Sequence, residues 1–346
     1  MSPSSSGAAS RASSRPVLEV QDLRTSFPDG AERRNVVDGV SLAVAPGETL
    51  ALVGESGCGK SLTALSILRL VPRPGRIESG SIRVAGREVR DLSVGEMRRL
   101  RGGEVGMIFQ EPMTSLNPVQ TVGRQVVEAV RLHHDETLAS ARRHAISLFE
   151  QVGIPDPAAR LDAYPHQLSG GMKQRVMIAM ALASRPPVLI ADEPTTALDV
   201  TVQAQILDLL RTLQREIGMA LLLITHDFGT VNEIADHVAV MYAGKIVEQA
   251  PRRDLLAAPR HPYTQGLLRS LPARGRPGER LEEIPGTVPP PSEWARGCRF
   301  VTRCPRAFEP CPDIEPVPTP VGPAHHACCH AVALEEGGAA STPPRE

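Results

Sequence analysis

The sequence predicts an α/β fold: a parallel core sheet with an antiparallel β edge and a helical insertion, plus a small C-terminal Cys-rich extension. The parallel core is indicated by the short apolar strand Thr49–Val53, which runs into a glycine-rich loop and a helix. Further apolar strands later in the chain alternate with helical patterns, as in parallel sheets. The antiparallel edge is indicated by Val36–Ala45, where Val40, Leu42 and Val44 alternate with small or polar residues.

The remaining elements follow from the same periodicities. From about residue 93 to about residue 165 the spacing of apolar residues is helical, which predicts the insertion. In the last long helix an apolar stripe is expected at Val202, Ile206, Leu209, Leu213 and Ile217. In chain order, the expected elements are strands Val17–Arg24, Val36–Ala45 and Thr49–Val53, helices Lys60–Leu70, Val122–His134 and Glu136–Val152, strand Val188–Asp192, helix Thr201–Ile217, and strands Ala220–Thr225 and Val238–Tyr242.

Bulk composition excludes several classes of function. The net charge is -1, so no overall basic bias points to nucleic acid. No apolar run approaches the roughly 18 residues that a membrane span needs. The N-terminal residues are rich in Ser and Ala without an apolar block, so they do not resemble a secretion signal. We therefore expect a chain that works in the cytosol and reaches a membrane through partners.

A phosphate-binding loop is the most specific motif in the chain. It fits G-x-x-x-x-G-K-[ST], in which backbone N–H groups converge on phosphate oxygens at a helix N-terminus. Lys60 is expected to pair with the β- and γ-phosphates and Ser61 to ligate Mg²⁺. Cys58 fills a free position, where a redox role is the less favoured interpretation. The expected nucleotide-binding residues of this loop are Gly54, Glu55, Ser56, Gly57, Cys58, Gly59, Lys60 and Ser61.

Two carboxylates end a later buried strand. Asp192 suits Mg²⁺, and Glu193 suits polarisation of an attacking water, because phosphoryl transfer depends on positioning and charge neutralisation. His226 also follows an apolar strand and is expected to contact the γ-phosphate. Gln110 is expected to reach Mg²⁺ and the attacking water. Each residue alone has an ordinary structural interpretation, but their order behind a phosphate loop favours catalysis.

A second glycine-containing loop opens a helix at Leu168–Arg175. Ser169 can cap this helix, and Gly170 and Gly171 allow backbone N–H groups to approach an anion. A plain helix cap is the alternative. The motif extends over eight residues, which favours a contact with nucleotide.

Together these motifs resemble those of ABC-transporter ATPases, over about Val17 to Gln249. They match the Walker A loop, Q-loop, signature, Walker B, D-loop (Ala197–Asp199) and H-loop of that family. The resemblance implies that ATP is held between the Walker A loop of one domain and the signature loop of another. A second ABC ATPase subunit, identical or paralogous, is therefore expected. The resemblance also implies that Phe27 stacks on the adenine.

A finer match is to the ATP-binding subunits of dipeptide/oligopeptide importers. It rests on Gln110–Pro118, Tyr164–Gln167, His261–Thr264 and the cysteine-rich tail. It implies ATP hydrolysis that drives import through two membrane permease subunits, supplied by an extracytoplasmic peptide-binding protein. This chain would then be peripheral at the cytoplasmic face of the membrane, with a permease docked on the helical insertion.

Domain boundaries follow from these matches and from composition. We expect a disordered tail at 1–15, an ABC ATPase domain at 16–250, an importer-type extension at 251–334 and a second disordered tail at 335–346. Nickel, glutathione or oligosaccharide cargo remains an alternative, since closely similar subunits serve such importers. A soluble ABC ATPase acting on ribosomes or DNA is a further alternative, which the single phosphate loop and the lack of heptads disfavour.

Five of the six cysteines lie in the last 50 residues. The spacing C-x5-C-x6-C is followed by sixteen or seventeen residues before the adjacent pair Cys328 and Cys329. Four thiolates suit zinc or an iron–sulfur cluster, and the absence of tight C-x2-C pairs favours a [4Fe–4S] cluster over zinc. Free thiols are the third possibility. The resemblance to the importer subunits implies Cys298, Cys304, Cys311 and Cys329 as ligands.

Overall fold

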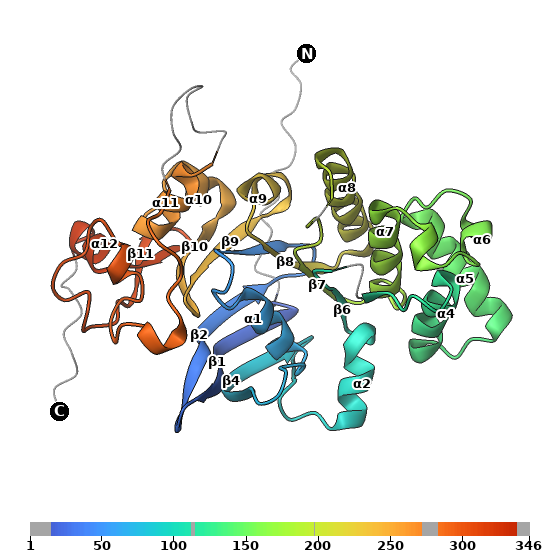
Figure 1. Ribbon diagram of the computed structural model, residues 1–346, viewed down its shortest axis with the longest axis horizontal. Coiled ribbons are helices and arrows are strands. Elements are labelled where there is room, and N and C mark those ends of the chain that lie inside the picture. The colour runs from blue at the N-terminus through green and yellow to red at the C-terminus, as the bar shows by residue number, and fades with distance from the viewer. Residues whose placement is uncertain (1–14, 112–114, 197, 272–282, 338–346) are drawn as a thin grey trace, which may run out of the picture.

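The large β-sheet is the centre of the molecule. The computed structural model describes residues 15–111, 115–196, 198–271 and 283–337. Within them, eight strands form one sheet in the order β11-β12-β10-β9-β3-β8-β7-β6 (Figure 1). The strands from β9 to β6 pair in parallel, which confirms the predicted core. The bounds are β3 Thr49–Val53, β6 Val105–Ile108, β7 Val188–Asp192, β8 Ala220–Thr225, β9 His237–Tyr242, β10 Lys245–Pro251, β11 Pro318–Gly322 and β12 His325–Cys328.

A second, antiparallel sheet confirms the predicted β edge. Its order is β2-β1-β4-β5, and β1 pairs with both β2 and β4. The predicted strands are present but longer than expected, and β4 and β5 were not predicted. The bounds are β1 Leu18–Asp29, β2 Glu32–Val44, β4 Arg76–Val84 and β5 Arg87–Glu88.

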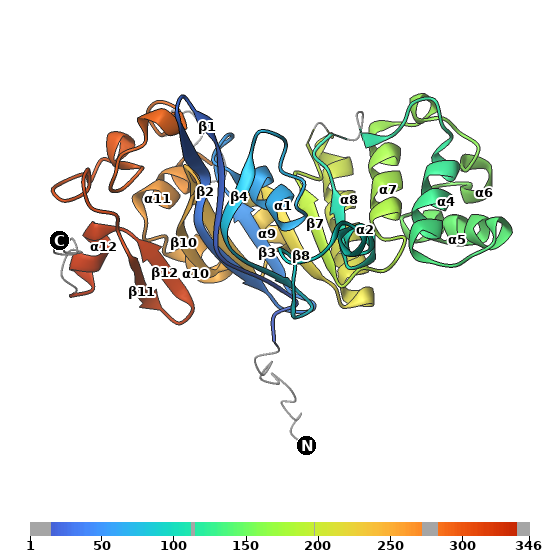
Figure 2. The same cartoon turned by 90° about the horizontal axis from the view of Figure 1, so that it is seen from below.

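Helices form a lobe at each end of the large sheet. In Figures 1 and 2, α4 to α6 lie beyond β6, and α10 to α12 lie at the opposite end beside β10 to β12. The bounds are α1 Lys60–Ile67, α2 Val94–Gly103, α4 Val122–His133, α5 Leu138–Gln151, α6 Pro157–Arg160, η1 Pro165–Gln167, α7 Gly170–Ala181, α8 Val200–Ile217, α9 Phe228–Ile234, α10 Arg252–Ala257, α11 Pro262–Arg269, η3 Pro291–Glu293, η4 Val301–Arg303 and α12 His330–Glu335.

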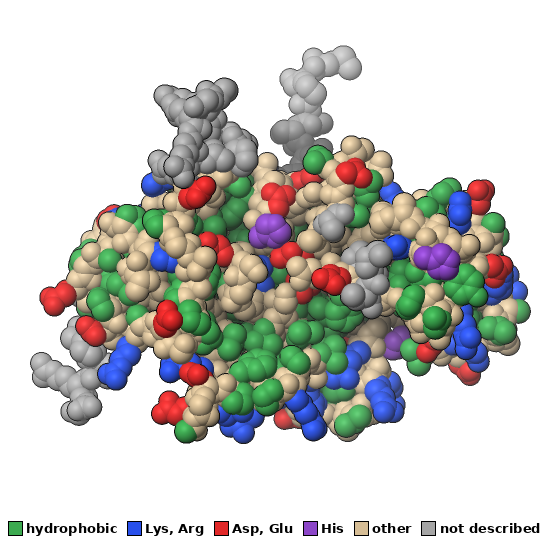
Figure 3. All heavy atoms as spheres, viewed as in Figure 1, with side chains coloured by type: hydrophobic (Ala, Val, Ile, Leu, Met, Phe, Trp, Pro, Cys, Tyr) green, Lys and Arg blue, Asp and Glu red, His purple; other side chains and the backbone are tan. Residues whose placement is uncertain are grey.

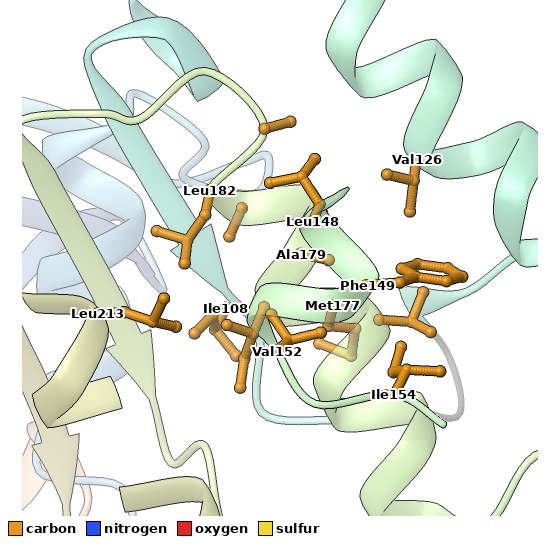
Figure 4. Packing of buried hydrophobic residues seen from close by; sticks show 14 of the residues in the cluster. Ile108, Val126, Leu148, Phe149, Val152, Ile154, Met177, Ala179, Leu182 and Leu213 are labelled. Carbon is orange, nitrogen blue, oxygen red and sulfur yellow. The ribbon is translucent and has the colours of Figure 1, made fainter. Parts of the chain in front are cut away.

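The helical lobe is joined to the sheet by one continuous apolar core. Phe149 of α5 and Val126 of α4 are fully buried, and they belong to the same cluster as Met177 of α7 and Ile108 of β6 (Figure 4). The expected helical range also contains β6, a strand of the large sheet. On α8 the buried side chains are Ile206, Leu207, Leu210, Leu213 and Gln214, so the predicted stripe is rotated toward Leu207 and Leu210.

The C-terminal segment continues the large sheet instead of forming a separate layer. β10 pairs with β9 on one side and with β12 on the other. Behind this junction the side chain of Glu248 is buried, and its carboxylate accepts a hydrogen bond from the Arg260 N–H at 2.7 Å and faces His325 Nε2 at 2.8 Å. Within the described ranges, every helix is too short or too polar to cross a bilayer. The expected tails at 1–15 and 335–346 lie almost entirely outside the described residues.

Candidate functional site

The phosphate loop connects β3 to α1, as predicted. Gly59 caps the helix with φ of 107°, a conformation that favours glycine. A side chain at Gly54 would come within 2.2 Å of the Met241 carbonyl oxygen, so only glycine fits there. Lys60 is 5 % exposed, and its Nζ donates to the carbonyl oxygens of Gly54 at 2.8 Å and Glu55 at 3.0 Å. The loop thus curls around the ammonium group that is expected to meet phosphate.

Ser61 and Asp192 lie side by side, although 131 positions separate them. The Ser61 hydroxyl donates to Asp192 Oδ1 at 3.1 Å. Burial raises the pKa of Asp192, and the hydrogen bond from Ser61 opposes that rise. A divalent cation at this hydroxyl and carboxylate would favour the charged carboxylate. The pair therefore has the donor set that Mg²⁺ prefers.

Glu193 is the centre of a polar cluster formed by residues from separate segments. Its Oε2 accepts from Gln110 Nε2 at 3.0 Å and from Thr196 Oγ1 at 2.9 Å, and its Oε1 lies 3.3 Å from His226 Nδ1. The Glu193 side chain is 13 % exposed and that of His226 is 62 % exposed. Glu193 has φ of 46°, which is uncommon outside glycine and is typical of functional sites. The three residues predicted for catalysis are therefore adjacent.

An open cavity of about 610 Å³ connects these residues to the phosphate loop. In the space-filling view, acidic side chains and a histidine gather near the middle of this face (Figure 3). One wall of the cavity comes from the C-terminal segment, which was not predicted to take part. The whole cavity is lined by Gly54, Glu55, Ser56, Gln110, Glu193, His226, Phe228, Leu267, Ser270, Gly286, Thr287 and Val288.

The C-terminal segment also bonds directly to the phosphate loop. The Tyr263 hydroxyl accepts the backbone N–H of Glu55 at 2.9 Å, and Arg303 pairs with the Glu55 carboxylate at 2.6 Å. Sequence reasoning missed these contacts and that of Thr196. Tyr263 lies in the His261–Thr264 motif, and Arg303 precedes Cys304, so both were visible as motif residues without an assigned role.

The second glycine loop lies elsewhere. Ser169 caps α7 by accepting from Met172 N–H, as predicted, and Ser169 and Gly170 are exposed. Neither residue lines the cavity. Gly171 packs so closely on α8 that a side chain there would lie 2.7 Å from Val202 Cγ1. Because this loop is exposed and does not line the cavity at the phosphate loop of the same chain, it is accessible to a second molecule.

Phe27 and Cys58 were also predicted to contact the nucleotide. Phe27 lies on β1 in the antiparallel sheet, half-buried, with its ring filling the space beside Gly75. Cys58 is 1 % exposed beneath Gly54, and burial raises the pKa of its thiol, which suits packing better than redox chemistry. Two motif segments, residues 112–114 of the Q-loop region and Ala197 of the D-loop, lie outside the described residues.

The four cysteines named as ligands interact with one another. All are free thiols; burial raises the pKa of Cys298 to about 12, with further contributions from Cys329, Cys311 and Cys304. Burial also raises the pKa of Cys328 to about 12, and the charged groups that affect this pKa most are Glu315 and Lys245. Among the described residues, however, no group of three or more His, Cys, Asp or Glu side chains is arranged to hold a metal ion. The described residues thus show no metal-binding group at these four cysteines.

Comparison with known families covers both parts of the chain. Residues 37–196 match the profile of ABC transporters. Residues 247–311 match the profile of the C-terminal region of oligopeptide/dipeptide transporters.

Curated relatives match nearly end to end. The chain is 50 % identical over 329 residues to a putative peptide import ATP-binding protein of Brucella melitensis, covering 92 % of this chain and 97 % of that protein. It is also 50 % identical over 314 residues to the dipeptide transport ATP-binding protein DppD of Escherichia coli, covering 91 % and 96 %. Among solved structures, a dimeric post-hydrolysis state of the ATP-binding cassette MJ0796 bound to ADP and Pi superimposes with a TM-score of 0.60 at 26 % identity, covering 68 % of this chain and 99 % of that one.

Proposed function

This chain belongs to the ATP-binding proteins of ABC peptide importers, and on that premise we propose that it hydrolyses ATP to drive import of di- and oligopeptides across a membrane. The observation that carries the proposal is the contact set at Glu193. A glutamate, a glutamine and a histidine from three separate segments meet at the open side of a phosphate loop. Peptide cargo is favoured over nickel, glutathione or oligosaccharide because the relatives are named for peptide and dipeptide transport.

Each residue has a distinct task in this proposal. Lys60 leaves the loop carbonyls to meet the β- and γ-phosphates, and the loop N–H groups bind the remaining oxygens. Glu193 accepts a proton from the attacking water, while Gln110 and His226 orient that water and the γ-phosphate. When bound, Mg²⁺ would neutralise charge on the β- and γ-phosphates; Ser61 and Asp192 fit it, with Gln110 as a further ligand.

The second half of the nucleotide site comes from another subunit. Ser169 and Gly170 are exposed at the start of α7, directly before Gly171, and all three lie outside the cavity of their own chain. A partner ABC ATPase, identical or paralogous, would therefore supply its signature loop to this phosphate loop. The dimeric state of MJ0796 bound to ADP and Pi supports pairing with a second ATPase subunit. Phe27 is proposed to stack on the adenine.

An apolar groove supports docking of a permease. It has a volume of about 240 Å³ and includes the exposed side chains of Leu70 and Phe109. It lies directly before Gln110, so a helix seated there would contact the segment that reaches Glu193. We propose a helix of a membrane permease as the occupant of this groove. In the assembled importer, each of two permeases would provide one such helix, and an extracytoplasmic peptide-binding protein would deliver peptide to the permeases. The chain would then work at the cytoplasmic face of the membrane. The apolar lining is Leu68, Leu70, Val105, Met107, Phe109, Ala129, Met177, Met180 and Ala181.

We also propose a functional division of the chain. Residues 16–250 form the ATPase domain with a helical subdomain at about 93–165, and residues 251–334 form the importer-type extension. The family matches at 37–196 and 247–311 support a boundary near residue 250.

A [4Fe–4S] cluster on Cys298, Cys304, Cys311 and Cys329 is proposed as a resident group of the extension. Backbone N–H groups aim at three of these sulfurs: Phe300 at Cys298, Arg306 at Cys304, and Ala331 and Val332 at Cys329. Such N–H groups are among the features that tune iron–sulfur sites. The cluster would supply structural cross-linking of the extension.

The transport proposal is tested with Lys60→Ala in the assembled importer. Parent protein should bind ATP and drive uptake of a radiolabelled dipeptide into vesicles. The Lys60→Ala variant should lose both, because no other described ammonium lies in the loop. Uptake by this variant at the parent rate would refute the proposal.

The cluster proposal is tested by purification without oxygen. The parent protein should be brown with broad absorption near ~400 nm, and Cys304→Ser should lose that absorption. Cys328→Ser is the matched control, since Cys328 interacts mainly with Glu315 and Lys245, and it should stay brown. A colourless parent with stoichiometric zinc would overturn the cluster.

A further inference from the structure

The C-terminal segment contacts the phosphate loop at Glu55. The Tyr263 hydroxyl accepts the Glu55 backbone N–H at 2.9 Å. Arg303 donates to both carboxylate oxygens of Glu55, from Nη1 at 2.6 Å and from Nη2 at 3.0 Å. The two contacts span 208 and 248 positions of sequence, so they exist only in the folded chain. Main chain and side chain of Glu55 are therefore both fixed from outside the ATPase region.

Arg303 also fixes the opposite wall of the cavity. Its Nε donates to the Pro285 carbonyl at 2.8 Å, and its Nη2 donates to the Gly286 carbonyl at 3.0 Å. Gly286 and Glu55 both line the cavity that holds Glu193. One guanidinium thus ties the phosphate loop to the segment facing it, using the several donors that only arginine has.

Charge gives this contact a further consequence. The Arg303 side chain is 5 % exposed, and burial would lower its pKa, but hydrogen bonds to Glu55 raise the pKa on balance. Arg303 therefore stays cationic. Glu55 lies in the loop that must accept a triphosphate, where a carboxylate without a counter-charge repels the ligand. Pairing with Arg303 removes that repulsion.

We infer that Arg303 is a positioning residue for ATP: it neutralises Glu55 and holds the phosphate loop against residues 285–286, which makes the C-terminal segment part of the nucleotide site. This inference rests on the proposed ATPase function. It assigns Arg303 no contact with the reacting atoms. Its action is transmitted through Glu55, so the two residues must be energetically coupled.

The experiment measures KM and kcat for ATP in the assembled importer. Arg303→Ala should raise KM about tenfold, with kcat changed by less than about threefold, because ground-state binding and not chemistry is lost. Adding Glu55→Gln to that variant should return KM to within about threefold of the parent, since the uncompensated charge is then gone. The KM of Arg303→Lys should lie between that of the parent and that of Arg303→Ala, because lysine keeps the charge but not the paired donors of the guanidinium.

Arg306→Ala is the matched control. Arg306 lies three residues further on, pairs with exposed Glu335 and should leave KM unchanged. A KM for folded Arg303→Ala within about twofold of the parent, or no rescue by Glu55→Gln, would overturn the inference. If Arg303→Ala does not fold, Arg303→Lys decides: an unchanged KM in that variant sinks the inference. A parent that binds no ATP at all would instead refute the proposed function.

Discussion

Replacement of Glu193 by glutamine isolates the proposed general base from its structural role. Glu193 Oε2 accepts from Gln110 and Thr196, so the amide oxygen of a glutamine can take the place of Oε2. Its amide NH₂ then lies at the position of Oε1 and can donate to His226 Nδ1, which is 3.3 Å away in the parent. The variant keeps shape and hydrogen bonds and loses only the ability to accept a proton.

The size of the effect follows from that single loss. A positioned general base contributes about 10²- to 10⁴-fold in rate, which corresponds to about 3–5 kcal/mol in the activation free energy. Glu193→Gln should therefore reduce ATP turnover by that factor in the assembled importer. Binding of ATP should be unchanged, because Lys60 and the loop remain intact.

The assay pairs steady-state phosphate release with equilibrium ATP binding. Glu216→Gln, on the exposed side of α8, serves as the matched control and should behave as the parent. Turnover by Glu193→Gln within about threefold of the parent, in a protein that melts normally, would remove Glu193 from the role of base.

Two further predictions concern stability. Gly171→Ala should lower the free energy of unfolding in urea by about 1–3 kcal/mol, because its Cβ would lie 2.7 Å from Val202 Cγ1. Gly170→Ala, whose Cβ would have its nearest contact at 3.4 Å, should lower the free energy of unfolding by less. Equal decreases in the two variants would contradict the packing argument. Burial lowers the pKa of His261 to about 4 from 6.5, so the unfolded chain binds the proton first. The contribution of His261 to stability should then be full above pH 6.5 and fall by about 3 kcal/mol down to pH 4, so the acid-induced loss of stability should be smaller in His261→Asn.

Short buried strands were the most predictable part of the fold. The predicted bounds of β3, β7 and β8 match the structure, because each is a mostly apolar run of five or six residues. β4 and β6 were not predicted as strands. In β4 the apolar residues Ile77, Ile82 and Val84 are separated by charged and small residues, so its apolar signal is weak, and the strand pairs with β1.

The candidate site was also only partly predictable from the sequence. Motifs named Lys60, Asp192, Glu193 and His226 as candidates, because phosphate chemistry constrains residue types at fixed spacings. No spacing indicates that Arg303 reaches Glu55 across 248 positions, since such a contact depends on how the C-terminal segment packs. Only the complete fold reveals it.

The position of β10 inside the sheet makes the last hundred residues difficult to remove. Ending the chain after β10 would strip β12 from one side of that strand and leave its N–H and C=O groups as an open edge. The same cut would take away the hydrogen-bond partners of Glu248, which are Arg260, His261 and His325. Open edges recruit other chains, so a shortened protein should precipitate or form insoluble deposits instead of yielding a minimal enzyme.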